Sequence, residues 1–566
     1  MAEAIRISDL FRNTRLTVSN GLRLLRRGDI GYVVIELSGS LPERMPRPSR
    51  RFPWSLLPWP APPLSVEAIT EILDRLAKDG RVQGVVFIIS DLNTGPGTLS
   101  SLRQAVAQFR QSGKRTVAYM QQFSMWSYYL AVACEQILAP ESASLQIAGL
   151  WSEALFLKDT LALVGIEADF EAFAEYKVSP DMFRRSEMSE PHREMLESIL
   201  DSLYAEVVGA IANGRSLAPS RVRELFDSVP LTAHQAHEAG LLDGVCYEDE
   251  VAARLGTPQA PVPTLTWDQA RGRVLRSRRW HSRQAIAVIC LEGMIVLGDS
   301  RRSPVPVPVP LPFASQQAGS STLVQQIRAA ARDKHIAAVI LHVDSPGGSA
   351  LASDLIWREL EILKRKKPLV VYMSNQAASG GYYVSAPAQA IYAQPTTLTG
   401  SIGIWGGKIV TRGLFDKVRA QREAVSRGAA AGLYADIAPF SEEERVKVRA
   451  EIGAGYARFK TRVAEGRGLS LEEVETVARG RVWTGEQALA AGLVDELGSL
   501  QAAAGRAREL AGISPRRYAP LVSVPTPKRE LLAQPSVETG EWLAAWSVLL
   551  REGVYALAPW VIRIRS

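Results

Sequence analysis

Two glycine-bearing turns decide the fold: His342–Ala350, which reads HVDSPGGSA, and Asn375–Ala386, which reads NQAASGGYYVSA. Each turn follows a β-branched run, AAVIL at 337–341 and PLVVYM at 368–373. Runs that are apolar on every residue are typical of parallel strands buried on both faces. Helical periodicity follows each turn, so strand and helix alternate. This alternation predicts an α/β protein with parallel sheets.

The region around the two turns is the second copy of an internal repeat. Tyr32–Gly39 (YVVIELSG) matches Ile286–Gly293 (IAVICLEG), and Leu231–Val245 (LTAHQAHEAGLLDGV) matches Trp483–Leu497 (WTGEQALAAGLVDEL). The matches keep one order and nearly one spacing, so the chain is two copies of one unit. The predicted organisation is an N-terminal extension at 1–30, a first repeat at 31–250, a linker at 251–283, a second repeat at 284–512 and a C-terminal tail at 513–566.

Composition excludes several classes of protein. The chain has 566 residues, with 66 basic and 59 acidic side chains and a net charge of +7, which is mild for this length and does not indicate a nucleic-acid partner. Three widely spaced cysteines exclude a disulfide scaffold and a cysteine-based zinc site, and no metal or cofactor is expected. No uncharged apolar stretch is long enough for a transmembrane helix, and no signal peptide is recognised.

Three segments have no assigned chemistry. Proline-rich stretches at 41–65 and 303–315 are expected to be extended, either as an apolar rim or as stiff spacers. The Trp-rich tail at 541–566 is either an interfacial, membrane-contacting segment or a helix docked on the protein. We therefore expect the protein to be peripherally membrane-associated or cytoplasmic.

Ser379 is the candidate nucleophile, because it stands between a strand and a helix, directly before Gly380 and Gly381. The backbone N–H groups of Gly380 and of Gly347 or Gly348 are the candidate oxyanion hole. A serine needs a base. His342 and Asp344 lie on one face of one strand, which orients a catalytic histidine poorly, and the His234/His237 pair lacks the glutamate of a zinc-protease helix. A buried, neutral lysine is chemically sufficient, but spacing does not select which one.

The order DSPGGS, ASGGYY, PTTLTGSIGIWG (395–406) and VWTGEQALAAGLVDELG (482–498) resembles the signal peptide peptidase family, also called protease IV, in its long duplicated form. The resemblance covers about residues 32–512. It implies tandem Clp-protease/crotonase-like domains and a Ser–Lys endopeptidase. The family's serine falls on Ser379, its lysine on Lys177 within FEAFAEYKVSPDMF, and a serine that orients the lysine on Ser401.

The two copies complement each other under this interpretation. Aligned on the Tyr-Tyr pairs, Ser379 corresponds to Met125, and the counterpart of Lys177 is the lysine-free stretch at 424–433. Each copy would thus hold half of one dyad. The expected function is cleavage of apolar peptides such as signal-peptide remnants, in a bowl-like homo-oligomer for which a tetramer is one candidate. The alternatives are a crotonase-like acyl-CoA enzyme, for which Asp344 is the nearest carboxylate, and an inactive scaffold of the same fold.

Overall fold

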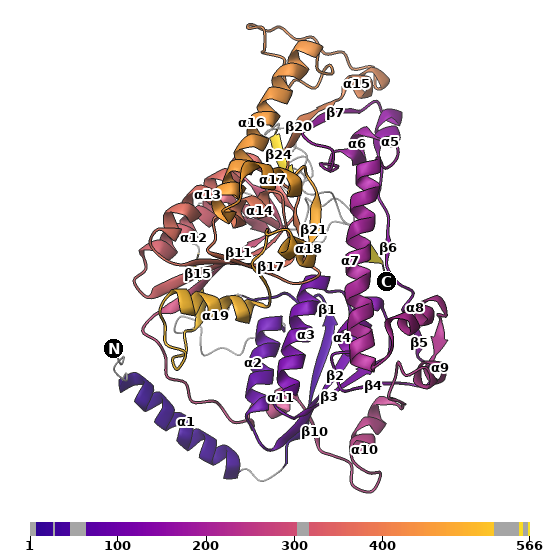
Figure 1. The fold of residues 1–566 in the computed structure, drawn as a ribbon, viewed down its shortest axis with the longest axis vertical. Helices are drawn as coiled ribbons and strands as arrows, with labels where there is room; N and C mark the ends of the chain where they lie inside the picture. Colours follow the sequence, from indigo (N-terminus) through magenta and orange to yellow (C-terminus); the bar gives the residue numbers. More distant parts are fainter. Residues whose placement is uncertain are drawn as a thin grey trace.

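The computed structural model describes residues 7–25, 29–45, 64–302, 316–525, 554–557 and 564–565. Most of the first proline-rich stretch, all of the second and most of the tail therefore lie outside the described residues. Within the described part, the protein is a mixed α/β structure with parallel sheets, as the sequence predicts. The main sheets of the two repeats lie one above the other in Figure 1, where the first repeat is coloured indigo to magenta and the second pink to orange.

The first repeat is built on a 6-stranded sheet in which all recorded pairings are parallel. Its strands, in spatial order, are β10 (Thr264–Thr266), β1 (Gly31–Gly39), β2 (Val82–Leu92), β3 (Arg115–Met120), β4 (Gln136–Ala139) and β9 (Gly244–Val245). Helices α2 (Val66–Ala77) and α3 (Pro96–Arg110) bury their apolar faces on this sheet. The apolar runs of the sequence thus become its buried strands.

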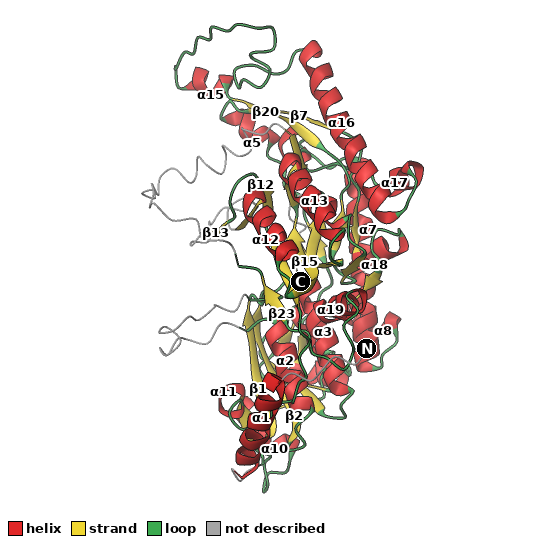
Figure 2. Cartoon of the chain, turned by 90° about the vertical axis from the view of Figure 1, so that its left-hand side faces the viewer, coloured by secondary structure: helices red, strands yellow, loops and turns green. Residues whose placement is uncertain are grey.

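The second repeat reproduces this plan. Its 8-stranded sheet comprises β21 (Val482–Thr484), β19 (Leu398–Gly400), β17 (Leu369–Ala378), β15 (Ile336–Ser345), β11 (Ala285–Glu292) and β23 (Leu521–Ser523). In addition, β18 (Ala390–Ala393) pairs with β17, and β22 (Glu496–Leu497) pairs with β18. Helices α12 (Ser320–Arg332), α13 (Ala350–Lys364) and α14 (Gly380–Ser385) cover one face, and α19 (Leu500–Leu510) packs on the other. Figure 2 shows the strands and covering helices from the side.

Equivalent contacts confirm that the repeats share one fold. The first tyrosine of each Tyr-Tyr pair donates to a backbone carbonyl, Tyr128 to Leu241 at 2.7 Å and Tyr382 to Leu493 at 2.9 Å. A bidentate Arg–Asp pair follows in each copy, Arg215–Asp243 and Arg467–Asp495. Each arginine ends a long helix, α7 (Glu190–Arg215) or α16 (Glu442–Arg467). A serine N-cap begins both helices, as their sequences predict.

A third, 7-stranded sheet joins the two repeats. Its order is β13 (Arg301–Arg302), β14 (Gln316–Gly319), β12 (Met294–Val296), β16 (Gly347–Ser349), β24 (Val554–Leu557), β20 (Trp405–Val410) and β7 (Glu167–Ala172). β7 belongs to the first repeat and pairs antiparallel with β20 of the second over six residues, Trp405↔Ala172 to Val410↔Glu167. Figures 1 and 2 show these two strands side by side at the end of the molecule opposite α10 (Val251–Leu255).

Two predicted segments differ from expectation. The linker at 251–283 carries structure of its own, because Thr264–Thr266 forms β10 at the edge of the first sheet. This strand is too short to be recognised from periodicity. In the Trp-rich tail at 541–566, the described residues are strands rather than a docked helix: β24 joins the third sheet, and β25 (Ile564–Arg565) pairs with β6 (Trp151–Ser152). Upstream of this segment, β23 extends the second sheet. Whether the remaining tail is interfacial lies outside the described residues.

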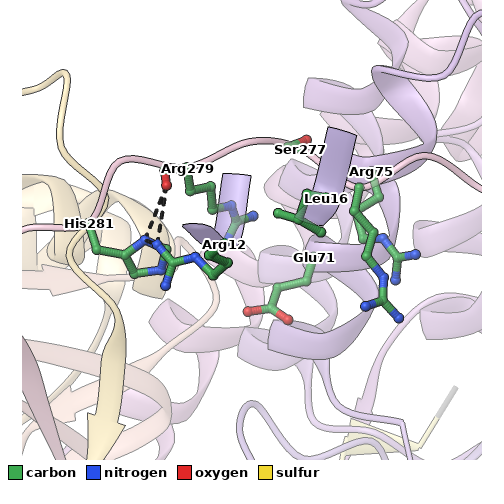
Figure 3. A pocket seen from close by; sticks show the side chains of 8 residues that line it. Arg12, Leu16, Glu71, Arg75, Ser277, Arg279 and His281 are labelled. Atoms are coloured by element: carbon green, nitrogen blue, oxygen red, sulfur yellow. Dashed lines mark hydrogen bonds between the residues drawn. The ribbon is translucent and has the colours of Figure 1, made fainter. Parts of the chain in front are cut away.

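The N-terminal extension contains helix α1 (Ile7–Leu25), which lies against the linker. Buried Asn13 donates to the carbonyl of Arg279 at 3.3 Å, and buried Asp9 accepts from the backbone N–H of His281 at 2.8 Å. A small pocket opens where α1, α2 and the linker meet, and half of the residues that line it are arginines, Arg12 and Arg75 among them (Figure 3). None of the candidate catalytic residues lines it. Across the described ranges, no helix combines the length and apolar character needed to cross a membrane.

Candidate active site

Ser379 is the residue at which β17 ends and α14 begins. Its backbone has φ +55° and ψ −113°, a conformation that an L-residue rarely adopts and that stores strain. Its N–H donates to the carbonyl of Gly400 at 2.7 Å, which holds the turn in place, and its side chain is buried. The strained strand-to-helix turn predicted from the sequence is therefore present.

The two glycine-bearing turns lie against each other at this point. A Cβ added to Gly381 would come within 2.9 Å of the carbonyl oxygen of Ser345, so only glycine allows the approach. The N–H groups of the first turn of α14, which include that of Gly380, have no acceptor within the helix. In the other turn, the N–H of Gly347 donates to Ser345 Oγ at 3.1 Å, and Gly348 is the register partner of Ile295. Gly347 and Gly348 are the two alternatives for the second oxyanion donor, and the N–H group of Gly347 is already hydrogen-bonded to Ser345.

Lys177 reaches this turn from the first repeat through the β7–β20 pairing. After β7 ends, Phe173 N–H donates to the carbonyl of Ile404 at 3.0 Å, and Tyr176 N–H donates to that of Arg479 at 3.0 Å. An ion pair of 3.0 Å between Arg479 and Glu175 adds a contact between this loop, which carries Lys177, and the second repeat. The lysine segment is therefore held by backbone contacts with the second repeat of the same chain.

The amine of Lys177 lies among three oxygen atoms. Nζ is 2.8 Å from Ser379 Oγ, 2.9 Å from Ser401 Oγ and 3.1 Å from the backbone carbonyl of Ser401. Lys177 is 1% exposed, and burial lowers the pKa of its amine well below the usual value. Burial is the one cause of this shift, and none of the described carboxylates opposes it. Burial therefore favours the neutral form of this amine, which lies within hydrogen-bond distance of the Ser379 hydroxyl.

Two glycines that the sequence did not single out shape the space around Lys177. A Cβ on Gly480 would lie 2.4 Å from the backbone nitrogen of Lys177, and one on Gly403 would lie 3.1 Å from its Cδ. Gly480 also has φ +83°, a region that glycine alone enters without strain. These residues position the lysine without touching the serine. The one sequence signal that could have identified these two positions is that both are glycines.

The rejected bases lie elsewhere. The ring of His342 contacts Ser374 Oγ at 3.0 Å, and Asp344 accepts from Asn375 at 2.8 Å, so neither group contacts Ser379. His237 contacts the carbonyl of Leu242, and His234 lies 3.8 Å from Glu141 on the surface. Among described residues, no group of potential metal ligands includes either of these two histidines.

A strand of the tail lies beside the candidate nucleophile. β24 is antiparallel to β16, with Gly347↔Leu557 and Gly348↔Ala556, and antiparallel to β20, with Trp405↔Tyr555. β16 is the turn that faces α14, and β20 follows the Ser401 turn. The structure thus contains a slot between two strand edges that accepts an extended polypeptide through its backbone.

Comparison with known proteins identifies the family. The model of peptidase family S49 matches twice, at residues 108–261 and 361–514, once in each repeat. The chain belongs to peptidase family S49. Family S49 membership makes the protein a serine protease and agrees with the duplicated α/β architecture.

Curated relatives agree with this assignment over most of the chain. "Serine protease SPPA, chloroplastic" of Arabidopsis thaliana is 33% identical over 480 residues, which is 83% of this chain and 69% of the relative. "Protease 4" of Haemophilus influenzae is 30% identical over 451 residues, 76% of this chain and 71% of the relative. "Protease 4" of Salmonella typhi is 30% identical over 459 residues, 77% of this chain and 71% of the relative. The S49 assignment therefore rests on both repeats, and the resemblance predicted from the motifs is confirmed.

Proposed function

We propose that Ser379 and Lys177 are the catalytic dyad of this serine protease, with Ser401 as the residue that orients the lysine. The observation that carries the proposal is the 2.8 Å contact between Lys177 Nζ and Ser379 Oγ, inside a site that lowers the pKa of the amine by burial. A neutral amine has two N–H donors and one lone pair. If the donors serve the two oxygens of Ser401, the lone pair is left to accept the Ser379 proton.

The first half of the reaction forms an acyl-enzyme. Ser379 Oγ attacks the scissile carbonyl carbon as its proton passes to Lys177 Nζ, and the carbonyl oxygen becomes an oxyanion. The N–H groups of Gly380 and Gly348 are the proposed donors to that oxygen, since Gly347 N–H is engaged by Ser345. As the tetrahedral intermediate collapses, the C–N bond breaks and Lys177 returns the proton to the leaving amine.

The second half releases the acyl group. A water molecule takes the place of the amine, gives a proton to Lys177 and attacks the ester carbon. The C–O bond to Ser379 then breaks, and Lys177 protonates Ser379 Oγ. Each turnover thus returns the lysine to its neutral form, which requires its pKa to remain low throughout.

We propose extended, apolar peptides such as signal-peptide remnants as substrates. The slot between β16 and β20 supports the extended conformation, because β24 pairs with both edges through its backbone. The family resemblance supports the apolar preference. Hydrolysis of matched apolar and charged peptides tests this preference, and faster cleavage of the charged series would contradict it.

We also propose that the protein works as a homo-oligomer, with a tetramer as one candidate, and that it makes peripheral membrane contact. The family resemblance supports the first part and the Trp-rich tail the second. The solution mass tests the assembly, and a monomer at working concentration would contradict it. Co-sedimentation with anionic vesicles tests the membrane contact, and a protein that stays in the supernatant would contradict that.

The dyad is tested with Ser379→Ala and Lys177→Met in a peptide-hydrolysis assay. Both variants are expected to lose activity to background while keeping the native assembly and a cooperative thermal transition, which for Lys177→Met should lie at or above the native temperature. Matched controls are Ser124→Ala, which removes the N-cap of α4 (Met125–Ala131) in the first repeat, and Lys114→Met, which removes another lysine whose pKa is lowered by burial. Near-normal turnover by Lys177→Met would refute the mechanism. Labelling by a serine-reactive acylating probe also separates the proposal from an inactive scaffold.

The acyl-CoA alternative is not supported. It needs a carboxylate at the glycine-bearing turns, and the one candidate, Asp344, is bound to Asn375 rather than directed at Ser379. Retention on an immobilised CoA matrix would revive it.

A further inference from the structure

A second cluster of reactive side chains lies away from the dyad, on the opposite face of the second sheet. Cys290, Glu292 and His342 place one ligand atom each within 4.8 Å of the others. We propose that these three residues form a zinc site, with water as the fourth ligand.

The strand register creates this cluster. Cys290 and Glu292 are two residues apart on β11, so their side chains share a face. His342 is the register partner of Cys290 on the adjacent parallel strand β15, and Asp344 is the partner of Glu292. The three ligands therefore sit on two adjacent, paired strands of the sheet.

The ring of His342 has the orientation expected of a metal-ligating histidine. His342 is 2% exposed, and its Nδ1 has no hydrogen-bond partner among the described residues. That atom faces Glu292 Oε1 at 3.8 Å, while Nε2 on the far side of the ring contacts Ser374 Oγ at 3.0 Å. A hydrogen bond on the second nitrogen is how proteins fix the ring of a ligating histidine. An unpartnered, buried nitrogen directed at a thiol and a carboxylate is otherwise costly.

The glutamate is held in the same way. Gln316 Nε2 donates to Glu292 Oε2 at 2.7 Å, which leaves Oε1 toward the histidine. The Glu292 side chain is 28% exposed, so an ion has a path to the site. Cys290 is a free thiol, available as a thiolate ligand once a metal binds. The cluster therefore has supported ligands, an opening and one open coordination position.

The charges balance for a divalent ion. A thiolate and a carboxylate carry two negative charges, which Zn²⁺ neutralises. The neighbouring cation, Arg44, is already paired with Glu67 at 3.4 Å and donates to the carbonyl of Leu521 at 3.2 Å. Zinc accepts sulfur, nitrogen and oxygen ligands together, at bond lengths of about 2.0–2.3 Å, whereas Mg²⁺ and Ca²⁺ prefer oxygen alone. Side-chain rotations of roughly 1 Å bring the three atoms to tetrahedral spacing.

A bound ion would tie β11 to β15 just before the turn that carries Gly347. The role implied is structural support of that turn, not participation in proton transfer, because none of the three ligands contacts Ser379 or Lys177 in the described structure. Metal binding can thus be measured in protein whose dyad has been removed.

The test uses the full chain carrying Ser379→Ala, stripped with a chelator and titrated with Zn²⁺ in competition with a chromophoric chelator. Co²⁺ serves as the optical probe, because a thiolate ligand adds a charge-transfer band. We expect about one equivalent of zinc per chain, a higher Tm in zinc, and no Tm response to Mg²⁺. Adding Cys290→Ser should abolish the cobalt band and weaken zinc binding by about 100-fold or more.

Cys246→Ser is the matched control, since it removes another free cysteine and should leave binding unchanged. Glu292→Gln, on the partly exposed ligand, tests the site without altering its buried core. The proposal would be overturned if Cys290→Ser left the zinc affinity and the cobalt spectrum unchanged. It would also be overturned if the folded protein did not bind zinc stoichiometrically.

Discussion

Gly480→Ala is the sharpest perturbation of the site that leaves both members of the dyad in place. The new Cβ would stand 2.4 Å from the backbone nitrogen of Lys177 and 2.6 Å from its Cα. Ordinary contacts between such atoms are about 3.4 Å or longer, so the lysine backbone must shift by roughly 1 Å. A displacement of that size typically costs about 100-fold in turnover. We expect kcat for peptide hydrolysis to fall by this factor while KM changes little.

The control for this change is Gly468→Ala, at the C-cap of α16. Gly468 has a similar backbone, φ +67°, but a Cβ there meets nothing within 4 Å. Both variants carry the same left-handed strain, about 1–2 kcal/mol, and only Gly480→Ala moves Lys177. Activity per folded molecule is measured after counting folded protein by its thermal transition. If the two variants had kcat values within about threefold of each other, roughly 0.65 kcal/mol, the positioning argument would be wrong.

Four further predictions concern the dyad and the slot. Activity should fall as pH drops through the lowered pKa of Lys177, because protonation removes the base, and a pH profile of kcat/KM flat through the acidic range would contradict this. Lys177→Met should raise the free energy of unfolding at neutral pH, by about 1.4 kcal/mol per unit of pKa lowering, because only the unfolded state binds that proton; denaturant titration measures it. Ser401→Ala should lower kcat by roughly 10–100-fold, because it removes the hydroxyl that contacts Lys177 Nζ. Truncation after residue 525 should raise kcat/KM, because it removes β24 from the slot.

Much of the fold could be predicted because it rests on local pattern. The β-branched runs, the helix caps at Ser189 and Ser441 and the matching repeats all reflect short-range rules. The β7–β20 pairing could not be predicted in this way, since its partners lie more than 200 positions apart and belong to different repeats. The position of β24 could not be predicted from local pattern either, because this strand pairs with the edges of β16 and β20, which are distant in the sequence.

The site divides along the same line. Ser379 could be predicted as the nucleophile from local sequence, because a strand, the serine, two glycines and a helix follow one another directly. Lys177 is not readable from spacing, because the burial that lowers its pKa is created by residues of the other repeat, and only the family resemblance pointed to it. The zinc site proposed at Cys290, Glu292 and His342 departs from the expectation, based on cysteine spacing, that a cysteine-based zinc site is excluded. Spacing along the chain could not show this cluster, because the proximity of its members depends on the register of β11 against β15.

The most direct test of the central claim is the ionisation of Lys177 itself. Protein labelled with ¹³C at the lysine side chains is titrated by NMR in the Ser379→Ala background, and the Lys177 signal is identified by its absence from Lys177→Met. We predict a titration midpoint well below the ordinary lysine value of about 10.4. A midpoint at or above that value would show a charged amine at neutral pH, and Lys177 could not then accept a proton from Ser379.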